Sequence, residues 1–237
     1  MNAYLWEPEK DRRVKCNLCR HRCIIRDGKR GICNVRENRS GALASLVYGK
    51  AIAGNVDPIE KKPLFHFMPG SRSYSIATVG CNLKCRFCQN ADIAQLPSDR
   101  KGMILGDAMP PEAVLSGAKR TGCRSISYTY TEPTVFFEYA YDTAKIACEA
   151  GIRNVFVTNG YMTAEALDMI RPYLDAANVD LKAYNDDFYR KFCGGKLEPV
   201  KESLVHMKSI GVFVEVTTLI VPGLNDDRTE IESLARF

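Results

Sequence analysis

From about residue 73 onward, short β-rich apolar runs alternate with longer segments that carry helix start and stop signals. This alternation is typical of βα units built around a parallel sheet. The expected strands are residues 74–79, 125–130, 154–158, 178–182 and 213–221. A polar group or a sharp turn follows each of them, and the carboxyl ends of parallel strands form the site in such folds. We therefore expect these groups to converge on one rim.

The segments between the strands read as helices that cross back over the sheet. Residues 110–122 begin with two prolines and end at a glycine, and residues 134–150 and 199–210 are each followed by a glycine. A further helix begins near Asp226, and no sixth strand follows it. The sequence therefore predicts an α/β fold, either an open doubly wound sheet or a partial (β/α) barrel whose closing strand is missing.

Composition matches an ordinary soluble globular protein. Hydrophobic residues make up 46% and charged residues 26%, and no apolar run approaches the roughly 20 residues that a membrane helix needs. The start of the chain has no apolar run or cleavage site of a secretion signal, which favours a cytoplasmic location. The net charge of +5 is mild and spread along the chain, so we expect neither a membrane nor a nucleic acid as partner.

Cysteine is the informative excess, with ten residues in a chain whose expected compartment keeps thiols reduced. Metal ligation is therefore the leading interpretation. Seven of the ten fall into two groups, four within residues 16–33 and three within residues 81–88. The isolated Cys123, Cys148 and Cys193 are interpreted as small core residues.

The second group follows the first expected strand directly, in the run GCNLKCRFCQN. Cys81, Cys85 and Cys88 are spaced C-x3-C-x2-C. The same spacing would place three small apolar side chains on one helix face, but Gly80 and Asn82 favour a turn here. Structural zinc needs four ligands, and only three come close together with no histidine nearby. Three thiolates instead suit a cubane iron–sulfur cluster with one iron left open.

This spacing, with Phe87 just before the last cysteine, resembles the signature of the radical S-adenosylmethionine (SAM) superfamily. The resemblance implies that Cys81, Cys85 and Cys88 hold a [4Fe-4S] cluster whose fourth iron is chelated by SAM. An electron from the reduced cluster then cleaves SAM to methionine and a 5'-deoxyadenosyl radical, which abstracts a hydrogen. A donor of the ferredoxin or flavodoxin type, with a reduction potential of about −400 mV, would supply that electron.

Polar residues at the other strand tips are candidate SAM contacts. Glu132 lies where the superfamily usually has a Gly-Gly-Glu that meets the methionine amino group, although tyrosine and threonine replace the glycines here. Asn159 follows the third strand, and Asp180 and Lys182 share one side of the fourth by its two-residue period. The alternatives are an acidic helix start at Glu132, a plain turn at Asn159 and a solvated surface pair.

The amino-terminal cysteines have the spacing C-x2-C-x3-C-x9-C. They are Cys16, Cys19, Cys23 and Cys33. Four thiols can complete a zinc site or a second iron–sulfur cluster, and the spacing does not separate the two. In the metal-free alternative the cysteines only pack, but a segment this short and charged has little apolar core of its own. We expect a cysteine-rich module with its lead-in at residues 1–72 and a core at residues 73–237.

A narrower resemblance is carried by the runs CNLCRHRC, GICNVREN, YGKAIAGNVDPIEKKPLFHFMPG and VGCNLKCRFCQN. They resemble the radical SAM enzyme of the AmmeMemoRadiSam system, which is close to the activating enzymes of pyruvate formate-lyase. YTYTEPT, TNGYM, DLKAY and VPGLNDD extend the match, and family members continue past residue 237, which favours a truncated chain.

This narrower resemblance implies a radical SAM oxidoreductase of the glycyl radical activating type, which abstracts hydrogen from a partner protein. Radical modification of another protein residue or of a small molecule is the competing enzyme hypothesis. A zinc-binding nucleic-acid adaptor is the non-enzyme alternative, and it predicts tightly bound zinc and strongly salt-dependent binding.

Overall fold

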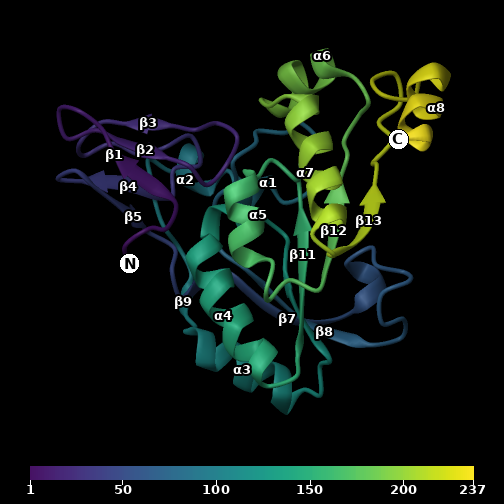
Figure 1. The fold of residues 1–237 in the computed structure, drawn as a ribbon, viewed down its shortest axis with the longest axis horizontal. Helices are drawn as coiled ribbons and strands as arrows, with labels where there is room; N and C mark the ends of the chain where they lie inside the picture. The colour runs from purple at the N-terminus through teal and green to yellow at the C-terminus, as the bar shows by residue number, and fades with distance from the viewer.

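The computed structural model describes all 237 residues and is built around one six-stranded sheet. The strand order is β13, β12, β11, β10, β8, β7 (Figure 1). The strands are β7 (Ala53–Pro58), β8 (Arg72–Ala77), β10 (Ser125–Tyr128), β11 (Arg153–Thr158), β12 (Ala176–Asp180) and β13 (Phe213–Thr217). Neighbours pair in parallel, except that β7 runs antiparallel to β8. Because β7 and β13 are both edge strands, the barrel is open, which confirms the expected partial barrel.

The five expected strands are confirmed, with ends that differ by a few residues. β13 shows the largest difference, because it ends at Thr217 and not at residue 221. β7 does not follow from the pattern, since its sequence AGNVDP is rich in residues that strands usually avoid. β7 tolerates these residues because it is an edge strand. It needs hydrogen bonds only on the side where it pairs with β8.

Four helices cover one face of the sheet (Figure 1). They are α3 (Pro111–Arg120), α4 (Phe137–Glu149), α5 (Ala164–Ile170) and α7 (Leu197–Ser209). α3, α4 and α7 lie at the expected positions, whereas α5 is short and has no glycine after it to mark its end. α3 packs closely on β8, since a Cβ on Gly117 would stand 2.7 Å from the Tyr74 ring. Helix and sheet approach this closely because glycine has no side chain.

The remaining helices and turns lie between these elements or after the last strand. They are η1 (Ile59–Lys61), α1 (Ala91–Ala94), α2 (Leu96–Asp99), the 3-10 turn η2 (Pro133–Phe136), α6 (Asp186–Phe188), the π-turn η3 (Tyr189–Cys193) and α8 (Arg228–Arg236). α8 is capped by Asp227, whose carboxylate accepts two backbone N–H groups, and it matches the helix expected near Asp226. No helix in the structure has both the length and the apolar character needed to cross a bilayer.

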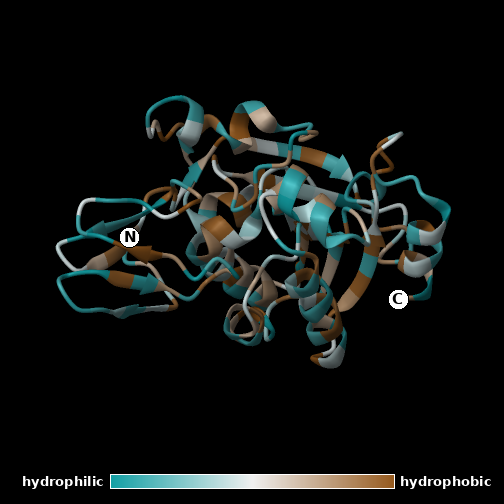
Figure 2. Cartoon of the chain, turned by 90° about the horizontal axis from the view of Figure 1, so that it is seen from above, coloured by the Kyte–Doolittle hydropathy of each residue, from teal (hydrophilic) through white to brown (hydrophobic).

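The amino-terminal residues form small antiparallel sheets. These are β1 (Trp6–Pro8), β2 (Val14–Cys16) and β3 (Ile24–Ile25) in one sheet, the hairpin of β4 (Arg36–Arg39) and β5 (Ala42–Ser45), and β6 (Lys50–Ala51) paired with β9 (Asp107–Ala108). Their loops are mainly hydrophilic (Figure 2). Val14, Val35 and Leu43 nevertheless belong to the same cluster of 43 buried residues as the core between sheet and helices. The amino-terminal module and the sheet therefore share one hydrophobic core.

A buried ion pair joins this module to helix α4. Arg36 of β4 donates from Nη2 to Oε1 of Glu138 at 2.8 Å and from Nη1 to Oε2 at 3.1 Å. The two side chains are only 2% and 0% exposed. The backbone N–H of Tyr4 also donates to Glu138, at 2.7 Å. A carboxylate on α4 thus connects two separate segments of the module.

The segment between β7 and β8, residues 59–70, lies against the sheet face opposite the helices. Ile59 and Leu64 form a small cluster with Val155 of β11 and Ala176 of β12, separate from the helix-facing core. Alternation along a strand places Val155 on the opposite face from its neighbour Phe156, which packs in that main core. Two N–H groups of the segment donate to the Glu215 carboxylate of β13, at 3.0 and 2.9 Å. The segment therefore closes the amino-terminal end of the open barrel.

Candidate active site

The expected cluster cysteines lie on the loop that follows β8, at the carboxyl rim of the sheet. Cys81, Cys85 and Cys88 are partly buried and none forms a disulfide. Gly80 starts this loop with a φ of 102°, a left-handed conformation that L side chains rarely adopt. A Cβ at this position would stand 2.6 Å from Cγ1 of Val35. Glycine therefore allows the loop to turn and to contact the amino-terminal module.

Backbone hydrogen bonds fix the loop against the π-turn η3. The N–H of Lys84 donates to the carbonyl of Cys193 at 2.8 Å, and that of Arg86 donates to Phe192 at 2.9 Å. The ring of Phe87 packs on that of Phe188, with centroids 5.6 Å apart. Phe87 thus holds the loop to α6, while its expected contact with SAM stays a prediction.

Asn159 and Glu132 lie beside the first cysteine. Asn159 donates from Nδ2 to Sγ of Cys81 at 3.7 Å, and its backbone N–H donates to Oε2 of Glu132 at 2.8 Å. Oε1 of Glu132 also accepts from the hydroxyl groups of Thr158, at 2.7 Å, and Thr134, at 2.5 Å. The structure therefore brings three of the expected residues together, and Glu132 holds the tips of β10 and β11 in register.

Burial controls the charge at this corner of the site. It raises the pKa of Glu132, although four hydrogen bonds to the carboxylate act in the opposite direction. Burial, followed by the nearby charge of Glu132, raises the pKa of Cys81 well above its usual value. Without a metal the protein therefore favours the neutral thiol of Cys81, and metal binding has to displace a proton.

Asp180 and Lys182 form the expected ion pair, with Nζ and Oδ2 3.0 Å apart. The side chain of Lys182 is 15% exposed and that of Asp180 is 41% exposed. The lysine is therefore mostly buried, and the carboxylate is accessible from the solvent. A hydrogen bond from the Cys193 thiol and the positive charge of Lys182 lower the pKa of Cys85 against the effect of burial. The structure thus places a cation where it stabilises a thiolate of the cysteine loop.

Tyr130 occupies one of the positions where the superfamily pattern has glycine. Its φ is 63°, in the left-handed region, so this position needs the conformation that glycine adopts most readily. Asn90 of the cysteine loop donates to its carbonyl at 2.8 Å. The phenol donates to the carboxylate of Asp57, and Nζ of Lys62 lies 4.3 Å from the ring centroid. One contact to the backbone and two to the side chain of Tyr130 offset the backbone strain.

Sequence reasoning missed three residues that contact Tyr130 or the cysteine loop. Asp57 and Lys62 form an ion pair, with side chains 6% and 1% exposed and Nζ 2.6 Å from Oδ2. The only sequence signal was an aspartate followed by two lysines in VDPIEKK, which reads as a solvated charge run. Cys193 is buried in the main core, as expected, and its thiol also hydrogen-bonds to Cys85. This approach of η3 to the loop is a long-range contact and leaves no local pattern.

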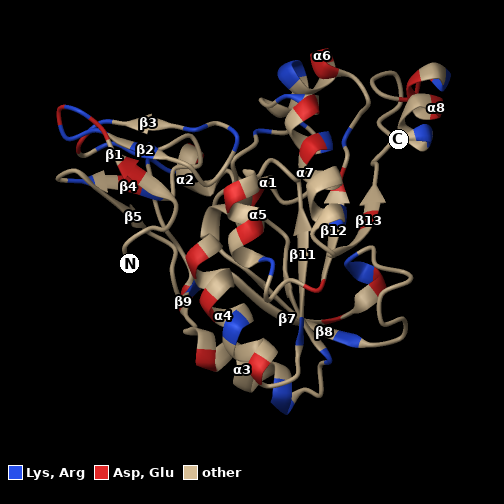
Figure 3. Cartoon of the chain, in the orientation of Figure 1, with Lys and Arg blue, Asp and Glu red and all other residues tan.

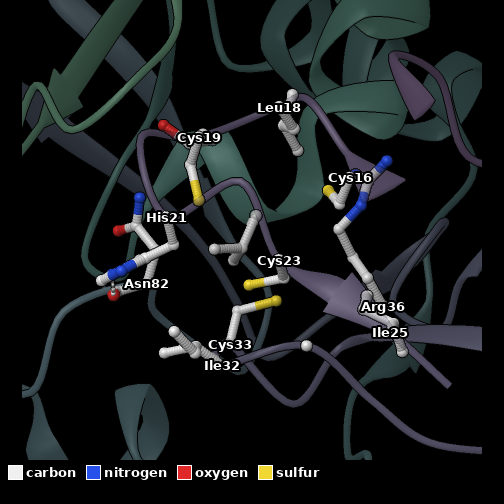
Figure 4. A pocket seen from close by; sticks show the side chains of 13 residues that line it. Cys16, Leu18, Cys19, His21, Cys23, Ile25, Ile32, Cys33, Arg36 and Asn82 are labelled. Carbon is white, nitrogen blue, oxygen red and sulfur yellow. Dashed lines mark hydrogen bonds between the residues drawn. The ribbon is translucent and has the colours of Figure 1, made fainter. Parts of the chain in front are cut away.

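The four amino-terminal cysteines line one pocket in the structure (Figure 4). Burial raises the pKa of Cys33 to about 11 and shifts that of Cys19 further in the same direction. Across the whole chain, no three His, Cys, Asp or Glu side chains converge as ligands of a single ion would. This holds for both cysteine groups.

The family model of the Radical SAM superfamily matches residues 75–237, which include the cysteine loop, part of β8 and four further strands of the sheet. The chain belongs to the radical SAM superfamily. The family implies a [4Fe-4S] cluster and SAM as cofactors. The match begins in β8 and excludes the four amino-terminal cysteines.

Relatives of this radical SAM protein include the uncharacterized protein MJ0808 of Methanocaldococcus jannaschii, which is 46% identical over 99% of this chain and 69% of its own length. The pyruvate formate-lyase-activating enzyme of Clostridium pasteurianum is 25% identical over 78% of this chain and 76% of its own length. Among solved structures, a radical SAM methyltransferase from Sphaerobacter thermophilus superposes with a TM-score of 0.53 at 18% identity, covering 72% of this chain and 53% of the other. The last comparison supports the fold.

Proposed function

We propose that this radical SAM protein binds a [4Fe-4S] cluster through Cys81, Cys85 and Cys88 and abstracts hydrogen from a partner protein. The observation that carries the proposal is the cysteine loop itself. Three partly buried thiols leave the first parallel strand at the carboxyl rim, within the residues that the family matches. The bound cluster and SAM would supply one-electron cleavage of SAM to a 5'-deoxyadenosyl radical.

The chemistry of the donor set fits this cofactor pair. Three thiols on one loop leave one corner of a cubane without a protein ligand. Lys182 favours the thiolate of Cys85, and Asn159 donates to Cys81. Asp180 is partly exposed at the same rim and is available to a polar group of SAM. We assign Glu132 the role of fixing Asn159, and contact with the methionine amino group remains part of the proposal.

The partner is proposed from the relatives. Several of them carry the name of glycyl-radical or pyruvate formate-lyase activating enzymes, which act on a protein. We therefore propose a protein substrate with a glycine as the reacting residue, a ferredoxin or flavodoxin type donor, and a reducing cytoplasmic location. Membership of the AmmeMemoRadiSam group is part of the same proposal. Figure 3 shows Lys and Arg scattered over many elements, which gives the nucleic-acid adaptor no support.

The decisive experiment is cofactor cleavage by protein reconstituted without oxygen. With dithionite and SAM, the wild type should release 5'-deoxyadenosine, and Cys81→Ala, Cys85→Ala and Cys88→Ala should each reduce the rate by at least about a hundredfold. Cys148→Ala is the matched control, because this cysteine is exposed and lies outside both groups. Iron-loaded wild type that releases no 5'-deoxyadenosine would contradict the proposal.

The protein substrate needs its own test. The enzyme, SAM and a candidate partner protein should give a glycine-centred electron paramagnetic resonance signal, which disappears when that glycine is replaced by alanine. Modified small molecules in the same mixture, with no protein-centred signal, would favour the competing enzyme hypothesis.

A further inference from the structure

The pocket in the amino-terminal module has the donor set of a metal centre. Its thiols are those of Cys16, Cys19, Cys23 and Cys33. All four are free, although four thiols in one pocket could have paired as disulfides. In Figure 4 the sulfurs of Cys23 and Cys33 point toward one another and that of Cys19 points into the same space. Leu18 and Ile25 line the pocket with them, so the sulfurs are shielded from water.

A buried cation with an unused donor lines the same pocket. Arg36 is 2% exposed, and its two Nη groups are used by Glu138 and by the carbonyl of Tyr4. Its Nε–H has no partner. A buried donor without an acceptor destabilises the fold. The guanidinium lies beside Cys16 in Figure 4, where a metal-bound sulfur could accept this hydrogen bond.

The position of the pocket beside the expected cluster loop favours an iron–sulfur cluster over a zinc ion. Four thiolates can ligate either group. Zinc has no redox chemistry, whereas an iron–sulfur cluster exchanges single electrons.

The pocket adjoins the loop of the first cysteine group. Asn82, which follows Cys81 directly, lines the pocket, and its carbonyl is 2.7 Å from Nε2 of His21. A Cβ on Gly80 would stand 3.3 Å from the carbonyl of Cys33. The two cysteine groups are therefore separated by only one or two residues of backbone. Clusters held by the two groups would therefore be neighbours, as electron exchange requires.

We propose that Cys16, Cys19, Cys23 and Cys33 hold a second iron–sulfur cluster, of the [4Fe-4S] type, next to the cysteine loop. The cluster accepts one electron from a low-potential donor of the ferredoxin or flavodoxin class and passes one electron to the cluster at residues 81–88. The first transfer would reduce this cluster and the second would reoxidise it, so its oxidation state is unchanged after one full cycle. The relay role rests on the proposed function, whereas the metal content of the pocket is independent of it.

The metal content is tested with the combined variant Cys81→Ala, Cys85→Ala, Cys88→Ala, which leaves the amino-terminal module intact. After anaerobic reconstitution, wild type should contain about eight iron and eight sulfide per chain and the variant about four of each. The reduced variant should give an electron paramagnetic resonance signal that SAM does not alter. One zinc per chain, or no metal, in this variant would overturn the proposal, and neither result depends on catalysis.

The relay is tested with Cys19→Ala and Cys23→Ala, with Cys123→Ala as the matched control from a buried cysteine outside both groups. With reduced flavodoxin as donor, SAM cleavage should fall by about tenfold or more, while dithionite, a small reductant, should support nearly the wild-type rate. Equal losses with the two reductants would overturn the relay. If these variants do not fold, the metal content of the combined variant still decides the site.

Discussion

At the scale of single residues, the cysteine loop depends on a glycine that has no room for a side chain, because Val35 occupies the space where its Cβ would lie. Gly80 combines a φ of 102° with a would-be Cβ contact of 2.6 Å to Val35. Gly211 also has a positive φ, 88°, but nothing lies within 4 Å of its would-be Cβ. The two positions therefore separate the cost of backbone strain from that of a steric clash.

We expect Gly80→Ala to lower the free energy of unfolding by about 3 kcal/mol, because strain and overpacking add. Gly211→Ala should lower it by only about 1 kcal/mol. Urea unfolding of the metal-free proteins, followed by circular dichroism, measures both. Equal losses of unfolding free energy would show that Val35 moves away from the new side chain without destabilising the fold.

A second residue-scale prediction concerns Asp57. Burial alone would raise its pKa, but hydrogen bonds from Lys61, Lys62 and Tyr130 outweigh burial and lower the pKa below its usual value. A carboxyl with a lowered folded pKa stabilises the fold above its unfolded pKa of about 3.9, and this stabilisation is lost as the pH falls through the folded value.

Asp57→Asn should therefore cost about 3–5 kcal/mol at pH 7, because Lys62 is 1% exposed and loses its counter-charge. Between pH 5 and pH 3, where the wild type begins to lose stability, the variant should lose less. Urea midpoints across this range provide the measurement. If the urea midpoint of the variant falls with decreasing pH as steeply as that of the wild type, Asp57 is not a source of the acid sensitivity.

At the scale of elements, the β4 hairpin and helix α4 are joined by Arg36 and Glu138. Removing either partner leaves an unpaired buried charge, so Arg36→Met and Glu138→Gln should each destabilise the protein by about 3–5 kcal/mol. The double variant should lose much less than the sum. A double-mutant cycle of unfolding free energies measures the coupling, and additive losses would contradict it.

The strands and helices were largely predictable because their signals are local. Residues 154–158, for example, are apolar and β-rich, and β11 forms there. β7 and the contact of Cys193 with Cys85 were not predictable, since one depends on an edge pairing and the other on a long-range approach. For the candidate site, the ion pair of Asp180 and Lys182 followed from strand periodicity. The several hydrogen bonds to Glu132 follow from the meeting of two strand tips, which no local pattern shows.

At the scale of the whole molecule, the sheet is unevenly protected. Every residue of β10 is buried, and β11 and β12 are buried over most of their length, whereas no residue of the edge strand β13 is. Amide hydrogen exchange should therefore be slowest in β10, β11 and β12 and much faster in β13. Exchange measured by mass spectrometry on peptides from each strand tests this order. Protection of β13 equal to that of β11 would contradict it.

The segment at residues 59–70 limits the directions from which a substrate can reach the cysteine loop. Because it packs across the sheet face at the amino-terminal end, Ile59 and Leu64 block passage from that side. In the proposed reaction a substrate therefore approaches the cysteine loop not from the amino-terminal end but from the carboxyl rim, where the proposed SAM contacts lie. A macromolecular partner that docks there would cover the cofactor beneath it, so we expect SAM to bind first and its spent fragments to leave only after the partner departs.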